Sequence, residues 1–223
     1  MPNLSEGTVL PAPSRADRKI KKASKWHCTV HAVRGGGAGT RMQGESKLEA
    51  DHQSLQFAQP DVEDVVEQAL FKFGWRNEKR HTFDMLVTKT SGERVACTVK
   101  PTSHLNSKDF LGKMEVVAWW VEEKKFASSV RLLTEADIDR VALHNANMNA
   151  AVHDRDPDAE NAVRAVARHF RGAISIKALT DKIDLQERGY RAILQLISKR
   201  ELQPLRHERI TPQTLIQWNG IQS

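Results

Sequence analysis

Three strand-like runs in succession, followed by a long amphipathic helix and one more strand, are the feature that most constrains the fold. The runs cover residues 70–75, 81–88 and 94–100, and a polar Ser-Gly turn separates the second from the third. Pro101 ends the third run because proline cannot donate a hydrogen bond to a neighbouring strand. Strands mixed with helices in this order predict an α/β domain.

Helices are expected on either side of these strands. Residues 109–126 give the clearest one, because apolar side chains recur there every three or four positions. A shorter helix is expected from Ser46, before the strands. A strand over 129–133 and a further helix capped by Thr134 complete the domain, which ends near Leu143.

The remaining segments have different compositions. Residues 1–24 carry prolines and many charges without an apolar period, and are predicted to form a flexible basic arm. The glycine-rich stretch 35–39 is predicted to be a flexible loop, and it lacks the Gly-Lys-Ser/Thr ending of a phosphate-binding loop. Residues 144–158 are rich in Asn, Asp and Ala, so we expect a linker between a domain of residues 25–143 and a second domain of residues 159–223.

The second domain is predicted to be winged-helix-like. Amphipathic helices are expected over residues 159–170, 174–183 and 186–200, and a small hairpin over 202–215. Three helices followed by a hairpin are typical of a winged helix.

Charge and composition narrow the class of partner. The net charge is +6 and the pI is about 9.4, with the basic excess at the two ends of the chain, which favours polyanion partners. No apolar stretch is long enough for a membrane span, and no secretory signal is recognisable. Cys28 and Cys97 form neither a metal-binding spacing nor a disulfide framework. A cytoplasmic location is expected.

Asp84 and Lys100 form the most informative pair in the sequence. If the strands that carry them are antiparallel neighbours, the two side chains meet near one end of the sheet. A carboxylate there can hold a divalent cation through oxygen, and a lysine can stabilise the charge of a phosphodiester transition state. A second carboxylate from the preceding helix would complete the site, and Glu49 is the best candidate.

Four short motifs carry a resemblance to a known family: Ser46 to Glu49, His81 to Asp84, Thr98 to Pro101 and Leu133 to Ile138. In order and rough spacing they resemble the TnsA transposon endonucleases of the PD-(D/E)xK superfamily. The resemblance implies a restriction-endonuclease-like mixed sheet flanked by helices over residues 25–143. It also implies catalytic residues Glu49, Asp84 and Lys100.

The same resemblance implies an activity and its partners. Such enzymes cut DNA at transposon 5′ ends with Mg²⁺, which Mn²⁺ can replace, beside a DDE-type transposase and an AAA+ ATPase regulator. Oligomerisation would come through this transposition complex, in a prokaryotic, nucleoid-associated setting. The implied metal contacts are Glu49, Asp84, Thr98 and the Val99 carbonyl.

Two positions depart from the family pattern. Phe83 replaces the usual proline before the aspartate. Thr98 stands where the superfamily has Glu, Asp or Gln, and a neutral hydroxyl is a weaker metal ligand than a carboxylate. The alternative function is therefore a catalytically weakened DNA-binding or assembly subunit of a transposition complex.

Each site residue also has a simpler interpretation. Glu49 can complete a capping box with Ser46, Asp84 can pair with Arg80, and Lys100 can be an ordinary surface lysine. The DNA contacts that we expect are Lys21, Lys22, Lys25, His81, Arg188, Arg191, Lys199 and Arg206. The alternative for the second domain is protein docking with a solvated basic face.

Overall fold

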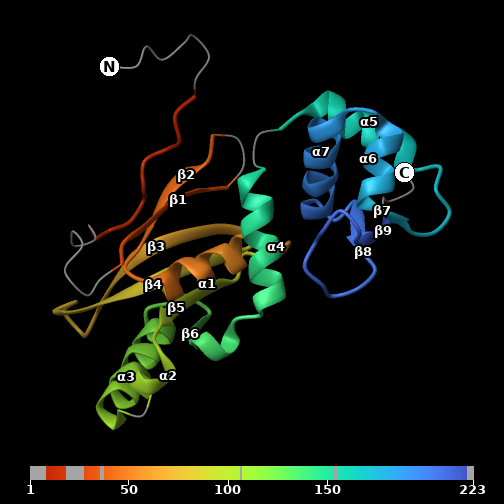
Figure 1. Ribbon diagram of the computed structural model, residues 1–223. Helices are drawn as coiled ribbons and strands as arrows, with labels where there is room; N and C mark the ends of the chain where they lie inside the picture. Colours follow the sequence, from red (N-terminus) through yellow and green to blue (C-terminus); the bar gives the residue numbers. More distant parts are fainter. Residues whose placement is uncertain (1–8, 19–27, 36–37, 106, 153–154, 220–223) are drawn as a thin grey trace. The chain divides into compact units, whose positions relative to one another are not determined.

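A mixed four-stranded sheet forms the centre of the first structural unit (Figure 1). This computed structural model describes residues 9–18, 28–35, 38–105, 107–152 and 155–219. In spatial order the strands are β3 (Val62–Phe73), β4 (Lys79–Lys89), β5 (Arg94–Val99) and β6 (Ser129–Leu133). β3, β4 and β5 are antiparallel neighbours, whereas β6 runs parallel to β5. The predicted α/β class is confirmed.

Each face of the sheet buries its own apolar cluster. Helix α1 (Lys47–Phe57) contributes Leu48 to the cluster that contains Met85 and Val99. Helix α3 (Lys108–Glu123), which follows the one-turn helix α2 (Thr102–Leu105), packs on the other cluster through side chains such as Val117. The strand alternation therefore supplies two cores, and each predicted helix covers one of them.

A β-hairpin was not predicted from the glycine-rich stretch. Strands β1 (Val30–Arg34) and β2 (Thr40–Gly44) pair across it. Gly39 has φ +72°, and a Cβ atom there would lie 2.6 Å from Cγ1 of Val33, so glycine is required at this end of the turn. The strands are short and half exposed, which is why they show no clear apolar pattern.

Part of the predicted flexible arm is held against the first unit. The Ala12 backbone exchanges hydrogen bonds with Gly39 and Arg41, at 2.9 Å each. Ser14 donates to Glu67 at 2.6 Å, and the guanidinium of Arg15 donates to Asp64 at 2.8 Å. Residues 9–18 are therefore anchored along the edge of the sheet. Lys21, Lys22 and Lys25 lie outside the described residues.

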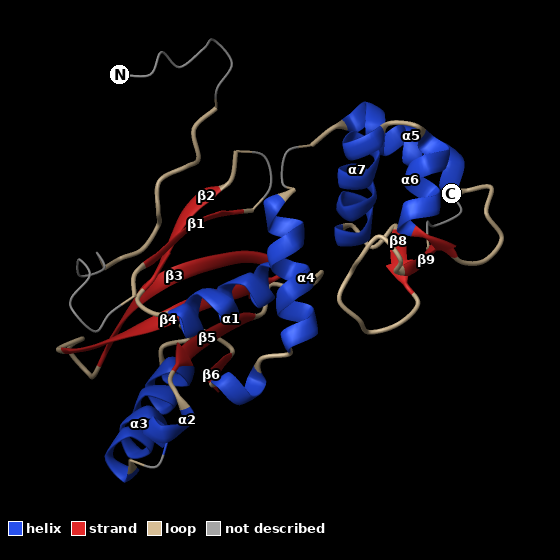
Figure 2. Ribbon diagram, in the orientation of Figure 1, coloured by secondary structure: helices blue, strands red, loops and turns tan. Residues whose placement is uncertain are grey.

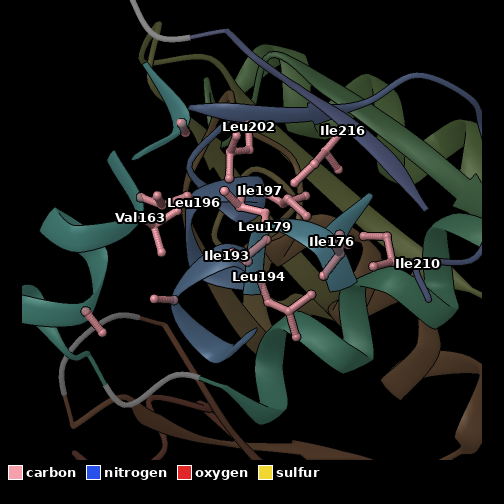
Figure 3. Close-up of a cluster of buried hydrophobic side chains, with 13 residues drawn as sticks. Val163, Ile176, Leu179, Ile193, Leu194, Leu196, Ile197, Leu202, Ile210 and Ile216 are labelled. Carbon is pink, nitrogen blue, oxygen red and sulfur yellow. The ribbon is translucent and has the colours of Figure 1, made fainter. Parts of the chain in front are cut away.

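In the second unit, Asp139–Ser223, the described residues form four helices and a small antiparallel sheet. The helices are α4 (Arg140–Ala151), α5 (Pro157–Ala167), α6 (Ile176–Ile183) and α7 (Gln186–Ser198), and the sheet orders β7 (Ile174–Ser175), β9 (Leu215–Trp218) and β8 (Leu202–Pro204). Leu179, Ile193 and Ile216 are fully buried at its centre (Figure 3). The predicted three helices and hairpin are present.

The predicted linker over residues 144–158 is wrong for its first half, which lies in α4. The Asp139 carboxylate caps this helix by accepting from the backbone N–H groups of Val141 and Ala142. Asn145 then binds the loop after β8, accepting from the Ile210 N–H and donating to the Glu208 carbonyl, each at 3.0 Å. These contacts make α4 part of the second unit. The sequence favoured a linker because the residues are polar and carry no apolar stripe.

One turn before α4 follows the sequence expectation closely. Thr134 and Asp137 form a reciprocal capping box, although the turn that they cap is a short 3₁₀ helix, η1 (Glu135–Asp137).

Among the described residues no helix is both long and apolar enough to cross a membrane.

Replacing Asn145 with alanine tests whether α4 is integral to the second unit. Asn145→Ala leaves the Ile210 N–H and the Glu208 carbonyl without their partner, so the free energy of unfolding should fall by about 1–3 kcal/mol. Asn147→Ala, in an exposed position of the same helix, should change it by less than about 0.5 kcal/mol. Urea unfolding measures both. Equal effects of the two substitutions would contradict the assignment.

Candidate active site

The pairing of β4 with β5 ends at Asp84. The last paired residues are Met85 and Cys97. Beyond them the buried Asp84 carboxylate, through Oδ2, accepts the Val99 N–H at 2.7 Å. The Asp84 side chain therefore accepts the hydrogen bond from the Val99 N–H, a backbone donor that would pair with the β4 backbone if the β4–β5 ladder continued.

Strands β3 and β4 are both irregular where the β4–β5 pairing ends. Phe83 and Leu86 belong to the same core cluster although they are three residues apart, so the two-residue alternation is interrupted between them. Opposite Asp84 on β3, the fully buried Gln68 has φ +49°, a left-handed conformation that is uncommon outside glycine. The side chains of β4 therefore do not follow a simple two-residue alternation around Asp84.

Lys100 follows directly after the hydrogen-bonded Val99. Its Nζ lies 3.7 Å from Oδ2 of Asp84, and its own N–H donates to the Leu133 carbonyl on β6 at 2.9 Å. The lysine side chain is about one-third exposed, with a relative accessibility of 36%. The Lys100 ammonium therefore lies close to the buried Asp84 carboxylate, in agreement with the predicted meeting of these two side chains. Lys100 is not an isolated surface lysine.

Glu49 lies in the first turn of α1, and two other polar side chains of this helix bind β2 and the residue that follows β6. His52 contacts the Thr134 carbonyl through Nε2 at 2.9 Å, and Gln53 donates to the Gln43 carbonyl at 2.9 Å. Burial and then the charge of Asp84 raise the pKa of Glu49, while Lys100 acts in the opposite direction. The charges of all three predicted catalytic residues therefore act on one another.

The capping interpretation of Glu49 is also realised. The Ser46 hydroxyl accepts the Glu49 N–H at 3.1 Å, and the Glu49 carboxylate accepts the N–H of Glu45 at 2.9 Å. The sequence predicted the N–H of Ser46 as the carboxylate's partner, one residue further along the chain. Capping fixes the carboxylate at the helix start and, because a carboxylate has about four acceptor positions, leaves capacity for a further ligand.

Asp84 is a carboxylate that its surroundings disfavour as an anion. Burial raises its pKa, whereas the Lys100 ammonium and the Val99 N–H lower it. Glu45 raises it further and Arg18 lowers it. Within the described residues, no hydrogen bond reaches Oδ1 of Asp84. The site thus contains a buried acid whose Oδ1 is free to bind a further ligand. The neighbouring positive charges do not offset the effect of burial on its pKa.

His81 and Thr98 form a separate pair beside this acid. Nε2 of His81 lies 3.4 Å from the Thr98 hydroxyl, and the imidazole packs edge-to-face on Phe83. Burial, followed by the charge of Lys100, lowers the pKa of His81, which favours the neutral ring. The hydroxyl of Thr98 is therefore directed to an imidazole, and nothing in its contacts supports the predicted metal contact.

Two residues of this site were not predicted. Arg18, at the end of the anchored arm, forms an ion pair with Glu45 at 2.7 Å and donates to Oε1 of Gln68 at 2.6 Å. Arg18 sits in a long basic stretch, so nothing in the sequence distinguished it from its neighbours. Glu45 stands next to the capping serine, which was the available signal for its position near Glu49.

The donor set fits a magnesium ion that is shared with substrate. Among the described residues no group of three His, Cys, Asp or Glu side chains could hold a metal on its own. Mg²⁺ is commonly bound by only one or two carboxylates together with waters and substrate phosphates. Glu49, Asp84 and the Val99 carbonyl are all oxygen donors of this type. Burial and then the charge of Asp84 raise the pKa of Glu49, and a bound cation would relieve the repulsion between the two carboxylates.

Two of the predicted DNA contacts in the second unit are held by carboxylates. Arg188 donates to Asp156 at 2.7 Å, which lowers the pKa of Asp156 to about 2. Lys199 lies 2.6 Å from the buried Glu160. Arg206 is exposed in the loop between β8 and β9. Phosphate would have to compete with these carboxylates at Arg188 and Lys199; the Arg188 pair is exposed to solvent, whereas the Lys199 pair contains a buried carboxylate.

Helix α7, which carries the predicted DNA contacts Arg188 and Arg191, is also largely covered. Residues 192–197 of α7 are all buried, and six consecutive residues pass around every side of a helix. Part of the cover comes from the end of α4, where Gln195 donates to the Val152 carbonyl at 2.8 Å. Arg191 is exposed near the start of α7 and takes part in interactions of its own.

Comparison with known proteins adds no assignment. No protein-family model matches the chain, and no curated protein matches it.

Asp84→Asn tests the electrostatics of the site through the pH dependence of stability. A raised pKa in the folded state means that the acid contributes stability at low pH that is lost as pH rises through the folded pKa. The asparagine can still accept the Val99 N–H but carries no charge. Without added metal, Asp84→Asn should therefore gain stability relative to the wild type as pH rises from 4 to about 8.

Urea unfolding of both proteins across this pH range measures the difference. A variant that loses stability relative to the wild type as pH rises would show that the folded protein favours the ionised form of Asp84.

Proposed function

We propose that the first unit is a metal-dependent DNA endonuclease. The single observation that carries the proposal is the convergence of Glu49, Asp84 and Lys100 at the point where β4 and β5 separate. Two buried acids with raised pKa values and an adjacent lysine suit phosphodiester hydrolysis better than a purely structural role, because buried charges are costly unless they are paired or bind an ion.

Each residue has a distinct task in this proposal. A bound Mg²⁺ would polarise the phosphate and lower the pKa of an attacking water. Asp84 and Glu49 hold that cation through their oxygens, and the Val99 N–H orients the Asp84 carboxylate. Lys100 stabilises negative charge as it develops on the phosphate. Its one-third exposure allows the ammonium to reach a substrate on the surface while it remains close to Asp84.

The fold and the motif order support a more specific version. The mixed sheet with helices on both faces agrees with a restriction-endonuclease-like domain, and the motif order resembles the TnsA endonucleases. The order α5, β7, α6, α7, β8, β9 is that of a winged helix. On this basis we propose cleavage at transposon 5′ ends, in an assembly with a DDE-type transposase and an AAA+ ATPase regulator in a prokaryotic cell.

A second candidate function is a catalytically weakened DNA-binding or assembly subunit. The contact of Thr98 with His81 favours it, because this position supplies no carboxylate or amide to the cation. Only two acidic side chains then remain for the metal, which weakens binding in the absence of substrate.

Substitutions in the site distinguish these functions. If the protein is an endonuclease, Asp84→Asn and Lys100→Ala should each reduce cleavage at least about 100-fold with Mg²⁺ or Mn²⁺. Asp61→Asn is the control, because Asp61 is an exposed carboxylate that pairs with Lys89 outside the site. The assay uses supercoiled and transposon-end DNA, with and without the transposase. Identical behaviour of the wild type and Asp84→Asn under every condition would refute the catalytic assignment.

Thr98→Glu tests whether the site has lost a ligand. If the chain is a weakened member of an active family, the new carboxylate should increase both Mn²⁺ affinity, measured by calorimetry, and cleavage. Thr98→Val removes the hydroxyl at similar volume and serves as the control. No gain from Thr98→Glu, in a protein whose unfolding midpoint is unchanged, would argue against past loss of a ligand at this position.

A further inference from the structure

A two-stranded ribbon of β3 and β4 continues past the end of β5. Pairing of β4 with β5 stops at Met85 and Cys97, whereas pairing of β3 with β4 continues to Phe73 and Lys79. Figure 2 shows this ribbon running on to the turn that joins the two strands. The ribbon starts beside Asp84, so an extended ligand that runs along it to its start reaches the candidate active site.

The two faces of the ribbon differ in character. Phe71 and Phe73 point toward α3 and are buried in its cluster. Strand alternation then directs Lys72 and its partner Arg80 to the opposite face, and both are exposed. We refer to Lys72, Arg80 and the exposed Arg76 of the adjoining turn as the basic ribbon.

Lys72 and Arg80 stand directly opposite each other in the β3–β4 register. Like charges in this position destabilise an antiparallel pair. In the part of the chain that the structure describes, no carboxylate lies within ion-pair distance of Lys72, Arg76 or Arg80. Glu78 is the one acidic residue of the sequence between residues 70 and 83, and its carboxylate accepts the Arg76 backbone N–H at 2.9 Å. The fold therefore keeps three uncompensated cations together.

The spacing connects the basic ribbon to the site. Arg80 precedes Asp84 by four residues on the same strand, which corresponds to about 13 Å at the rise of a β-strand. Lys100 supplies a further cation, one-third exposed, beside Asp84. A polyanion that contacts Arg80 and Lys100 together would lie over the buried carboxylates.

We propose that the basic ribbon binds the phosphate backbone of duplex DNA and places it on the candidate active site. The choice of DNA rests on the proposed function. Lysine and arginine contacts to phosphate set the position of a duplex without reading its sequence, and they give an affinity that falls with salt. The anion neutralises the opposed cations, so the unfavourable Lys72–Arg80 pair is explained by binding.

Arg80→Glu in the full-length protein gives a sharp test because binding and stability should change in opposite directions. The variant should bind a fluorescent duplex about tenfold more weakly in metal-free buffer, with a smaller dependence of affinity on salt. Its urea midpoint should rise, because Lys72 then faces an opposite charge. Lys113→Glu makes the same kind of charge change on α3, across the sheet, and should bind within about twofold of the wild type.

Three results would overturn the proposal. Unchanged DNA affinity of Arg80→Glu, equal loss of affinity in Lys113→Glu, or tighter binding of an RNA duplex of the same sequence would each do so. If Arg80→Glu lowers stability, the double variant Lys72→Gln, Arg80→Gln replaces it, with the same expected loss of affinity. The two proposals fail separately, because normal cleavage by Asp84→Asn would refute only the catalytic assignment and unchanged DNA affinity of Arg80→Glu would refute only the basic ribbon.

Discussion

The hydrogen bond from the Val99 N–H to the Asp84 carboxylate is the contact on which the site depends. Leaving that buried donor unpaired would cost about 1–3 kcal/mol, so the end of the β4–β5 ladder requires an acceptor at this position. Asp84 provides it and is fixed in place. Because Lys100 is the residue after Val99, the same contact brings the lysine within 3.7 Å of the carboxylate. One hydrogen bond thus positions both the carboxylate and the ammonium group of the candidate site.

The sequence predicted this convergence because its causes are local. The β4–β5 hairpin brings residues 84 and 100 to the same end of the strand pair, and the start of a helix after Ser46 is readable from its cap. The pairing of His81 with Thr98 and the anchoring of Arg18 could not be predicted in this way. Arg18 and Gln68 are 50 residues apart, and only the folded chain shows that they meet.

In the C-terminal unit the sequence predicted the helices and strands but not the contacts of the basic residues. Its predicted helices and hairpin are present, yet the basic residues that suggested DNA contact at Arg188 and Lys199 are used within the unit. The number of basic residues can be counted from a sequence, but the carboxylates that pair with them are known only from the folded structure. Among the described residues, three cations without a carboxylate partner lie together on the β3–β4 ribbon of the first unit, and the composition of this segment did not single them out.

The central claim is that Glu49 and Asp84 hold a divalent cation beside Lys100. Diffraction from crystals soaked in Mn²⁺, recorded for the manganese anomalous signal, tests it most directly. The account predicts a peak about 2.0–2.6 Å from an oxygen of Asp84, shared with Glu49 or the Val99 carbonyl. Saturating Mn²⁺ without a peak at these oxygens, in crystals grown with DNA bound, would contradict it.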